Sequence, residues 1–246
     1  VALRRVELAR RLDHEEPLLQ YVQRFDHADE YRMLGSARSN LANEHIHATG
    51  DVFVDVESDR VFVRPRGIDT LIPYELAIDV DGDLPLTVRG VLTGGAWTVK
   101  TFVSPCDPRE NVERWRATAD GPDVHILTCD PLDLPFASGG MSELRGLPIQ
   151  LPRDHFGTIS TRTLTFPAGR WRITTTADDG IRVWMDEQLV IDDWTHHAPE
   201  THTHDFEVAE GGRTINFRVA HFELDGHAVL QMDIAPQLAP GLPGVD

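Results

Sequence analysis

The sequence is poor in positive charge. Lys100 is the only lysine among 23 basic residues, which face 40 acidic ones, and the formal net charge is −17. Proteins that bind nucleic acid or anionic membrane surfaces need a basic patch, so this balance argues against both kinds of partner. A surplus of carboxylates is instead compatible with the binding of cations.

Long apolar runs are also missing. No stretch of 18 or more apolar residues occurs, so the given chain is predicted to contain no transmembrane segment. The chain begins at Val1 and not at methionine, which is compatible with the removal of a signal peptide or membrane anchor. Cys106 and Cys129 are the only cysteines and lack metal-binding spacing, which leaves either one disulfide or two unrelated thiols.

Motifs of catalysis are scarce as well. The sequence has no GxSxG nucleophile elbow, no HExxH helix and no phosphate-cradling loop. Among the 40 acidic residues none stands out as one member of a catalytic pair. We therefore expect that the protein is not an enzyme.

The first 49 residues differ in pattern from the rest. Within residues 1–26, Leu8 and Leu12 lie one helical turn apart, which predicts a helix, and Pro17 interrupts it. The stretch that follows is rich in turn-forming residues. We expect residues 1–49 to be a short helical and irregular N-terminal segment.

From Asp51 onward the apolar pattern has a period of two, which is typical of half-buried strands. Short strands at regular spacing, with no helical stretch between them, predict an all-β protein built as an antiparallel β-sandwich. We place a first β-rich domain at residues 50–129, a second β-sandwich at 130–236 and an extended tail at 237–246.

The second block resembles a PA14 domain. "LDLPFASGG" is similar to the first strand of that family, and "FGTISTRTLTFPAGRWRITTTADDGIRVWMDEQLVIDDW" is similar to its core, with an Asp-Asp-Gly turn and a closing tryptophan. "EGGRTINFRVAHFELDGHAVLQMDI" resembles the final hairpin. The resemblance covers about residues 130–236, and the N-terminal half matches no family known to us.

The resemblance implies a mostly extracytoplasmic module without chemistry of its own. In lectin members of the family, the paired aspartates hold a calcium ion that in turn binds sugar hydroxyls. Here these residues would be Asp178 and Asp179. The loop "FELDGHA" would complete the site with Asp225, where lectin members often have asparagine.

The aspartate pair has two competing interpretations. Consecutive strand residues point to opposite faces, so two neighbouring carboxylates chelate one ion only if a cis peptide bond turns both to one side. A calcium site therefore predicts a cis bond between Asp178 and Asp179. Alternatively, Asp-Gly is a strong hairpin-turn signal, with Gly180 at positive φ and an aspartate accepting backbone N–H groups.

Histidines and tryptophans concentrate in the second block. Four histidines lie close together, and we expect them to be exposed loop residues because nothing in the sequence makes them converge on zinc: His196, His197, His202 and His204. We expect Trp171 and Trp184 in the core of the sandwich and leave Trp194 open, because it borders a loop.

Two functions follow from these observations. The first is a non-catalytic extracytoplasmic recognition module, periplasmic or at the cell surface, that binds a glycan or protein partner with calcium as its expected cofactor. The second is a structural accessory subunit that docks into a larger envelope or membrane-associated complex through its N-terminal segment and its tail.

Overall fold

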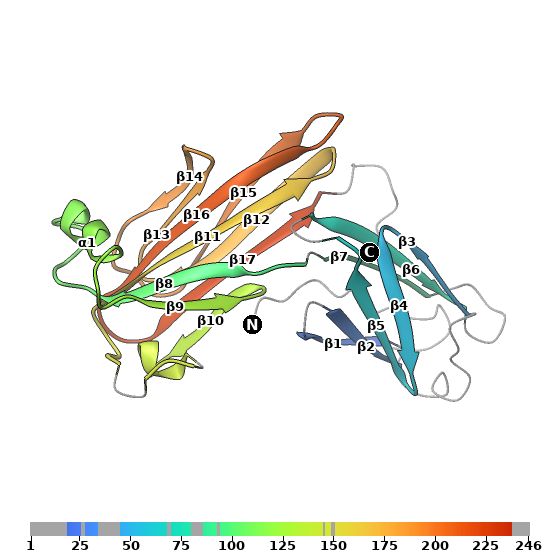
Figure 1. Cartoon of the computed structure of the whole chain (residues 1–246), viewed down its shortest axis with the longest axis horizontal. Helices are drawn as coiled ribbons and strands as arrows, with labels where there is room; N and C mark the ends of the chain where they lie inside the picture. The colour runs from blue at the N-terminus through green and yellow to red at the C-terminus, as the bar shows by residue number, and fades with distance from the viewer. Residues whose placement is uncertain are drawn as a thin grey trace. The chain divides into compact units, whose positions relative to one another are not determined.

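The computed structural model describes most of the chain (Figure 1). The described residues are 19–25, 28–33, 45–67, 70–79, 86–92, 94–144, 146–148 and 151–237. They form two compact units, one within residues 3–95 and the other within residues 96–246. Within the described residues, no helix has the length and apolar composition needed to span a bilayer.

The N-terminal unit consists of strands in two antiparallel sheets. One sheet has the order β1-β2-β5-β4 and the other the order β3-β6-β7. The strands are β1 (Leu19–Phe25), β2 (Ala28–Met33), β3 (Ile46–Thr49), β4 (Val52–Glu57), β5 (Arg60–Pro65), β6 (Ile72–Ile78) and β7 (Leu86–Leu92). Alternating residues of both sheets meet in one apolar core, where the hydroxyl groups of Tyr31 and Tyr74 are hydrogen-bonded.

The helix expected at the N-terminus is not formed where the structure describes the chain. Residues 19–25 and 28–33 are the paired strands β1 and β2, and β2 also pairs with β5. Tyr31 and Met33 are both buried, and this spacing of two places them on one face of a strand. The first 18 residues, with Leu8, Leu12 and Pro17, lie outside the described residues.

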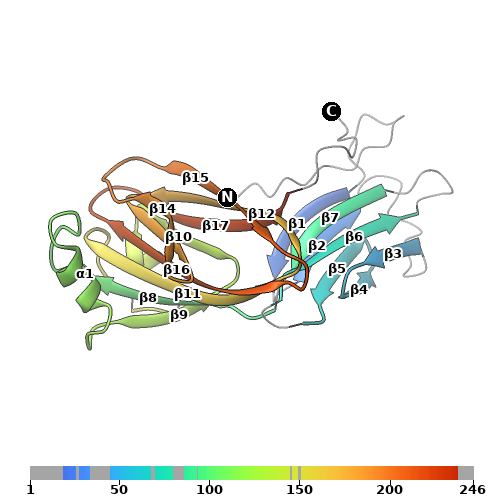
Figure 2. The ribbon, with the colours of Figure 1, turned by 90° about the horizontal axis from the view of Figure 1, so that it is seen from above.

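The C-terminal unit is an antiparallel sandwich of two sheets (Figure 2). One sheet has the order β10-β17-β12-β15 and the other the order β14-β13-β16-β11-β8-β9. Its strands are β8 (Trp97–Val103), β9 (His125–Cys129), β10 (Leu132–Ala137), β11 (Phe156–Phe166), β12 (Gly169–Asp178), β13 (Ile181–Met185), β14 (Gln188–Asp193), β15 (Glu200–Val208), β16 (Arg213–Glu223) and β17 (Ala228–Pro236). The all-β class and the antiparallel sandwich are thus confirmed.

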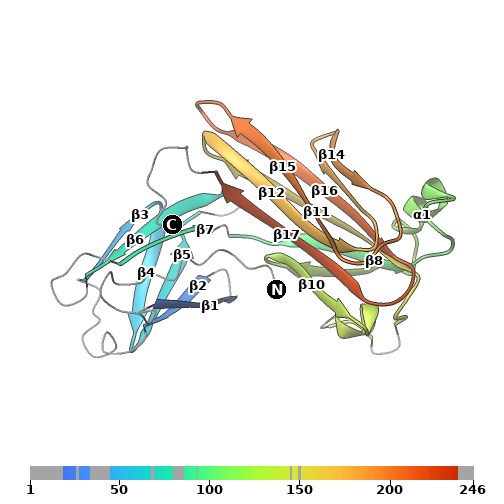
Figure 3. The same cartoon turned by 180° about the vertical axis from the view of Figure 1, so that it is seen from behind.

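Aromatic side chains fill the space between these two sheets. Phe166 of β11 packs edge-on against Trp171 of β12 and Phe206 of β15, with ring centroids 5.2 Å apart in both pairs. Phe136 of β10 contacts Phe156 of β11 with centroids 4.8 Å apart. Figure 3 shows β17 and β12 side by side in the sheet that faces β11 and β16. These aromatic contacts, together with buried aliphatic side chains, hold the two sheets together.

The boundary predicted between residues 129 and 130 is corrected to residues 95 and 96. β8 pairs along β11, and β9 pairs with β8, so residues 97–129 complete the six-stranded sheet of the sandwich. The residue after β9, Asp130, also forms a buried ion pair with β11, in which Arg162 Nη1 donates to Asp130 Oδ1 at 2.9 Å. A period-two pattern indicates a strand but does not show which distant strand it pairs with, so the sequence could not place β8 and β9 in this sheet.

A short helix, α1 (Val112–Thr118), connects β8 to β9, and a 3-10 turn spans Gly140–Glu143. The helix begins at Asn111, whose side-chain oxygen accepts a hydrogen bond from Arg114 N at 3.0 Å. Trp115 is its only buried residue, and it packs on Trp194 with ring centroids 5.1 Å apart. Trp194, whose burial could not be predicted from the sequence, is thus half-buried against the helix.

Other side-chain expectations have mixed outcomes. Trp171 is buried in the core as predicted, whereas Trp184 is half-buried with the Arg218 guanidinium 4.2 Å from its ring centroid. Cys106 and Cys129 are free thiols. Residues 238–246 of the predicted tail lie outside the described residues.

Candidate functional site: a buried carboxylate cluster

The Asp-Asp-Gly sequence forms a crossover between the two sheets of the sandwich. β12 ends at Asp178 in the four-stranded sheet, and β13 begins at Ile181 in the six-stranded sheet. The hairpin interpretation is therefore wrong, because a hairpin joins neighbouring strands of one sheet. The peptide bond between Asp178 and Asp179 is cis, as the sequence analysis expected for a pair whose side chains face one way.

At this crossover residue 180 must be glycine because a side chain would collide with its neighbour. The φ of Gly180 is not in the positive range, which corrects the role predicted from the sequence. A Cβ atom on Gly180 would overlap the ring of Phe222. The backbone N–H of Phe222 donates to the carbonyl of Gly180 at 3.1 Å. Gly180 therefore allows the end of β16 to pack directly against the aspartate pair.

This packing brings in Glu223, which the sequence analysis did not select. Glu223 is the last residue of β16 and is 0% exposed. Neither of its carboxylate oxygens has a hydrogen-bond partner among the described residues. The period-two pattern of β16 carried the signal: the inward positions Ile215, Phe217, Val219 and His221 are followed at the next inward position by Glu223.

Three carboxylates thus converge at the crossover. One oxygen from each of Asp178, Asp179 and Glu223 lies within 4.8 Å of the other two. Two oxygens bound to one calcium ion can be at most about 5 Å apart, because each Ca–O distance is about 2.3–2.6 Å. The spacing and the all-oxygen donor set therefore fit a hard divalent cation.

The electrostatics of the cluster show a missing positive charge. Burial raises the pKa of Glu223 to about 9, and the nearby charges of Asp179 and Asp178 raise it further. Burial, followed by the charge of Asp179, also raises the pKa of Asp178 to about 6. The pKa of Asp179 is raised by burial too, although its backbone hydrogen bonds oppose that shift. Without a cation, the cluster must hold protons at neutral pH or bear an uncompensated charge.

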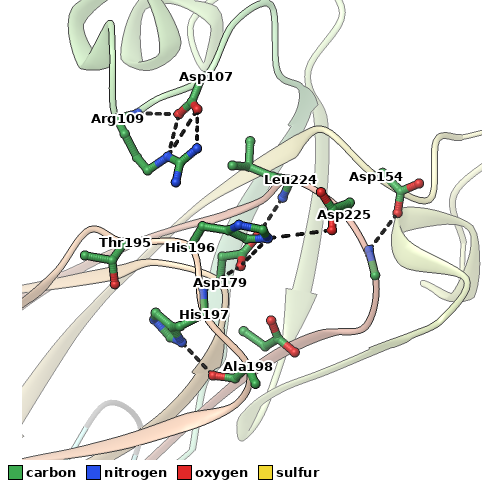
Figure 4. A network of polar contacts seen from close by, with 12 residues as sticks. Asp107, Arg109, Asp154, Asp179, Thr195, His196, His197, Ala198, Leu224 and Asp225 are labelled. Atoms are coloured by element: carbon green, nitrogen blue, oxygen red, sulfur yellow. Dashed lines mark hydrogen bonds and ion pairs between the residues drawn. The ribbon is translucent and has the colours of Figure 1, made fainter.

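No arginine among the described residues supplies that charge by direct contact. Arg109 is close enough for its charge to be felt by Asp179. Its guanidinium, however, donates to both carboxylate oxygens of Asp107, with Nη2 to Oδ2 at 2.6 Å and Nε to Oδ1 at 3.0 Å (Figure 4). This two-point pairing commits Arg109 to Asp107.

Asp179 is held in place by backbone groups. Its Oδ1 accepts from the N–H of His197 at 3.0 Å, and its Oδ2 accepts from the N–H of Leu224 at 2.8 Å. These contacts leave further lone pairs on the carboxylate. They fix the side chain to the 194–198 loop on one side and to the end of β16 on the other.

Asp225 lies at the rim of the cluster. Its side chain is 73% exposed, and its Oδ1 is 3.6 Å from His196 Nε2. The same nitrogen is 3.6 Å from Asp179 Oδ1, so His196 stands between Asp225 and Asp179 (Figure 4). The final hairpin expected around Asp225 is instead a second crossover, because β16 and β17 belong to different sheets. The structure thus brings Asp225 close to the pair, while the inner third carboxylate is Glu223.

His221 forms a hydrogen bond with the backbone of the crossover. It is 0% exposed, and its Nε2 donates to the backbone carbonyl of Asp178 at 2.9 Å. Burial lowers the pKa of His221 to about 4, so the ring is neutral at pH 7. A neutral ring adds no positive charge to the cluster and acts as a hydrogen-bond donor to the backbone.

Comparisons with known proteins agree with the likeness read from the sequence. The family model of the PA14 domain matches residues 148–238. No curated protein matches the chain. Among solved structures, the PA14 domain of the MpAFP antifreeze protein is 15% identical, with a TM-score of 0.45 and coverage of 57% of this chain and 81% of that one.

Two further solved structures are similar at the same level. The PA14 sugar-binding domain from an RTX adhesin is 16% identical, with a TM-score of 0.42 and coverage of 57% of this chain and 89% of that one. An anti-sigma factor domain-containing protein is 15% identical with a TM-score of 0.43, and 57% of this chain covers 43% of its length. The segment that matches the PA14 family model, residues 148–238, lies within the C-terminal sandwich, whereas the N-terminal half matches no family model.

Proposed function

We propose that the C-terminal unit is a non-catalytic recognition domain that holds a calcium ion at the crossover and uses it to bind a glycan. The observation that carries this proposal is the cluster of Asp178, Asp179 and Glu223, whose carboxylates are buried and, among the described residues, form no ion pair with arginine or lysine. A bound cation would offset the burial and the mutual repulsion of the carboxylates, which together raise the pKa of Glu223 and Asp178.

The donor chemistry favours calcium over other cations. All three inner donors are carboxylate oxygens, which hard cations prefer. Magnesium keeps several waters and needs near-octahedral geometry, so a site with three converging carboxylates suits the larger ion better. Asp178 is slightly exposed and Asp225 strongly so, which places the solvent side of the site at this rim.

Calcium at this position would offer its remaining coordination sites to ligand oxygens, and pairs of sugar hydroxyls are such ligands. The chain's own residues do the positioning. The N–H groups of His197 and Leu224 orient Asp179, and Asp225 with His196 borders the place where a sugar would lie. The resemblance to sugar-binding PA14 domains supports the same assignment. We infer a location outside the cytoplasm as part of this proposal, since calcium is abundant there.

Calcium binding is tested first by thermal melting of the full chain. With a dissociation constant of about 0.1–1 mM, as in extracellular modules, 10 mM calcium stabilises the folded protein by about 1.4–2.7 kcal/mol. We expect Asp178→Asn to abolish this gain and Asp133→Asn, an exposed residue of β10, to retain it. An equal gain in both variants would contradict the site.

Glycan binding is tested on an array of oligosaccharides in calcium and in chelator. We expect binding only in calcium, and none for Asp178→Asn. If calcium binds but no glycan does, the second function becomes the better account: an accessory subunit in which the ion orders a surface for a protein partner in a membrane-associated complex. Isolation of the full chain with a stable partner would then test that function.

A further inference from the structure

A second group of potential ligands lies on the other side of the 194–198 loop. Asp193 ends β14, Glu200 and His202 begin β15, and His197 lies in the loop between them. One ligand atom each of Asp193, Glu200 and His202 lies within 4.8 Å of the other two. Unlike the first cluster, this group contains imidazole nitrogens, which suit transition metals.

His197 gives an independent sign of a missing ligand. Its Nδ1 is 2.6 Å from the carbonyl oxygen of Ala198, which only accepts, so Nδ1 carries the proton and donates it (Figure 4). In the neutral ring Nε2 then bears a lone pair. The side chain is only 10% exposed, and Nε2 is buried with no hydrogen-bond partner. Nε2 lies 3.2 Å from Asp193 Oδ2, so the lone pair of a neutral His197 faces a carboxylate, and either a bound cation or a proton on Nε2 would bridge the two.

His202 approaches the same oxygen. Its Nε2 lies 2.9 Å from Asp193 Oδ2. Ligands of a tetrahedral zinc ion, at about 2.0–2.1 Å from the metal, are about 3.3 Å from one another. The two measured separations differ from that edge by a few tenths of an ångström. Each ring nitrogen therefore already lies at nearly one ligand–ligand distance from Asp193 Oδ2.

The surrounding contacts orient the ligands as in metal sites. The hydrogen bond from His197 Nδ1 to a backbone carbonyl fixes the tautomer that presents Nε2. The hydroxyl of Thr195 donates to Asp193 Oδ1 at 2.6 Å, which leaves Oδ2 to face the histidines. Glu200 is exposed at the edge of the group and would close the site from the solvent side.

We propose that Asp193, His197, Glu200 and His202 bind a divalent transition-metal ion, with zinc as the expected occupant. The sequence pattern predicts that these histidines are exposed loop residues that do not converge. The structure corrects this for His197 and His202, because β14 and β15 bring both rings to Asp193. The site is separate from the carboxylate cluster in its ligands, although the backbone N–H of His197 holds Asp179.

The test is a calorimetric titration of the chelator-treated full chain with zinc, in the presence of calcium. We expect one saturable site per chain, weakened by about 10–100-fold or more in His197→Gln and in His202→Gln. His204→Gln is the matched control, because His204 lies two residues along β15 and is also half-buried. It should bind zinc as the unchanged protein does, and so should Asp178→Asn.

Cobalt provides a measurement that does not depend on how the variants fold. Cobalt(II) bound by two imidazoles and carboxylates in a four-coordinate site gives visible absorption bands, and added zinc should displace them. Three outcomes would overturn the proposal: no saturable zinc binding, equal weakening in the His204 variant, or unchanged binding in the His202 variant. In the first case a proton shared between His197 and Asp193 holds the group together instead.

Discussion

Replacement of Glu223 by glutamine gives the sharpest test of the charge imbalance at the crossover. The pKa of this carboxyl group is raised from 4.5 to about 9 by burial and by the charges of Asp179 and Asp178, with further contributions from Asp154 and Asp225. Between these two pH values the folded chain keeps a proton that the unfolded chain releases. The folded state therefore binds more protons, and stability falls as pH rises across this window.

The magnitude follows from the distance between the two pKa values. Each pH unit above 4.5 removes about 1.4 kcal/mol, so at pH 7 the unmodified, metal-free chain has lost about 3 kcal/mol through Glu223. Glutamine does not titrate, and its amide can donate to the carboxylate of Asp178. In chelator, Glu223→Gln should therefore be more stable than the original chain by an amount that grows from pH 5 to pH 8.5.

Tryptophan fluorescence is the assay, because all five tryptophans lie between Trp97 and Trp194 and report only on the C-terminal unit. Glu207→Gln, an exposed residue of β15, is the matched control and should track the original chain at every pH. Calcium should narrow the difference at pH 8, because it stabilises the ionised Glu223 of the original chain, whereas in the variant the calcium site lacks one of its three carboxylate ligands. A stability difference that does not change with pH, in chelator, would refute the reasoning.

The remaining predictions concern residues that build the site. Gly180→Ala places a Cβ against the Phe222 ring and should lower the free energy of unfolding by about 1–3 kcal/mol in urea unfolding. Phe222→Leu in the same chain should recover part of the loss. No recovery would contradict the packing argument. Asp130→Ala removes the carboxylate that pairs with the buried Arg162 and should lower the free energy of unfolding by about 3–5 kcal/mol in urea unfolding. A loss of less than about 1 kcal/mol would mean that the ion pair contributes nothing. Burial lowers the pKa of His221 from 6.5 to about 4, so between these pH values the unfolded chain binds a proton at this residue that the folded chain does not. The melting temperature should therefore fall as pH drops from 6.5 to 4, and His221→Gln should weaken this fall.

Local sequence pattern was sufficient to predict strands from Asp51 onward and to single out the aspartate pair, but it missed β1, β2 and β3. Alternation of apolar and polar residues is a property of each strand alone, and the unusual Asp178-Asp179-Gly180 sequence is visible without a fold. The pattern says nothing of which strands pair. For this reason the assignment of β8 and β9 to the sandwich, and the crossover at Gly180, emerged only from the structure.

The two ligand clusters were hidden for a related reason. Glu223 stands 44 residues from Asp179 in sequence, and it reaches the pair only because Phe222 packs on Gly180. His197 and His202 converge because β14 and β15 bring them to Asp193, which cannot be read from their spacing. The inward position of Glu223 on β16 was nonetheless predictable from alternation, since an acid at a core position calls for a partner.

The central claim is that a calcium ion completes the cluster of Asp178, Asp179 and Glu223. A crystal structure of the full chain grown in calcium tests it most directly. The claim predicts an ion within about 2.3–2.6 Å of an oxygen from each of the three carboxylates, and its loss from crystals of Asp178→Asn. A well-ordered crossover in calcium with no ion among these oxygens would contradict it.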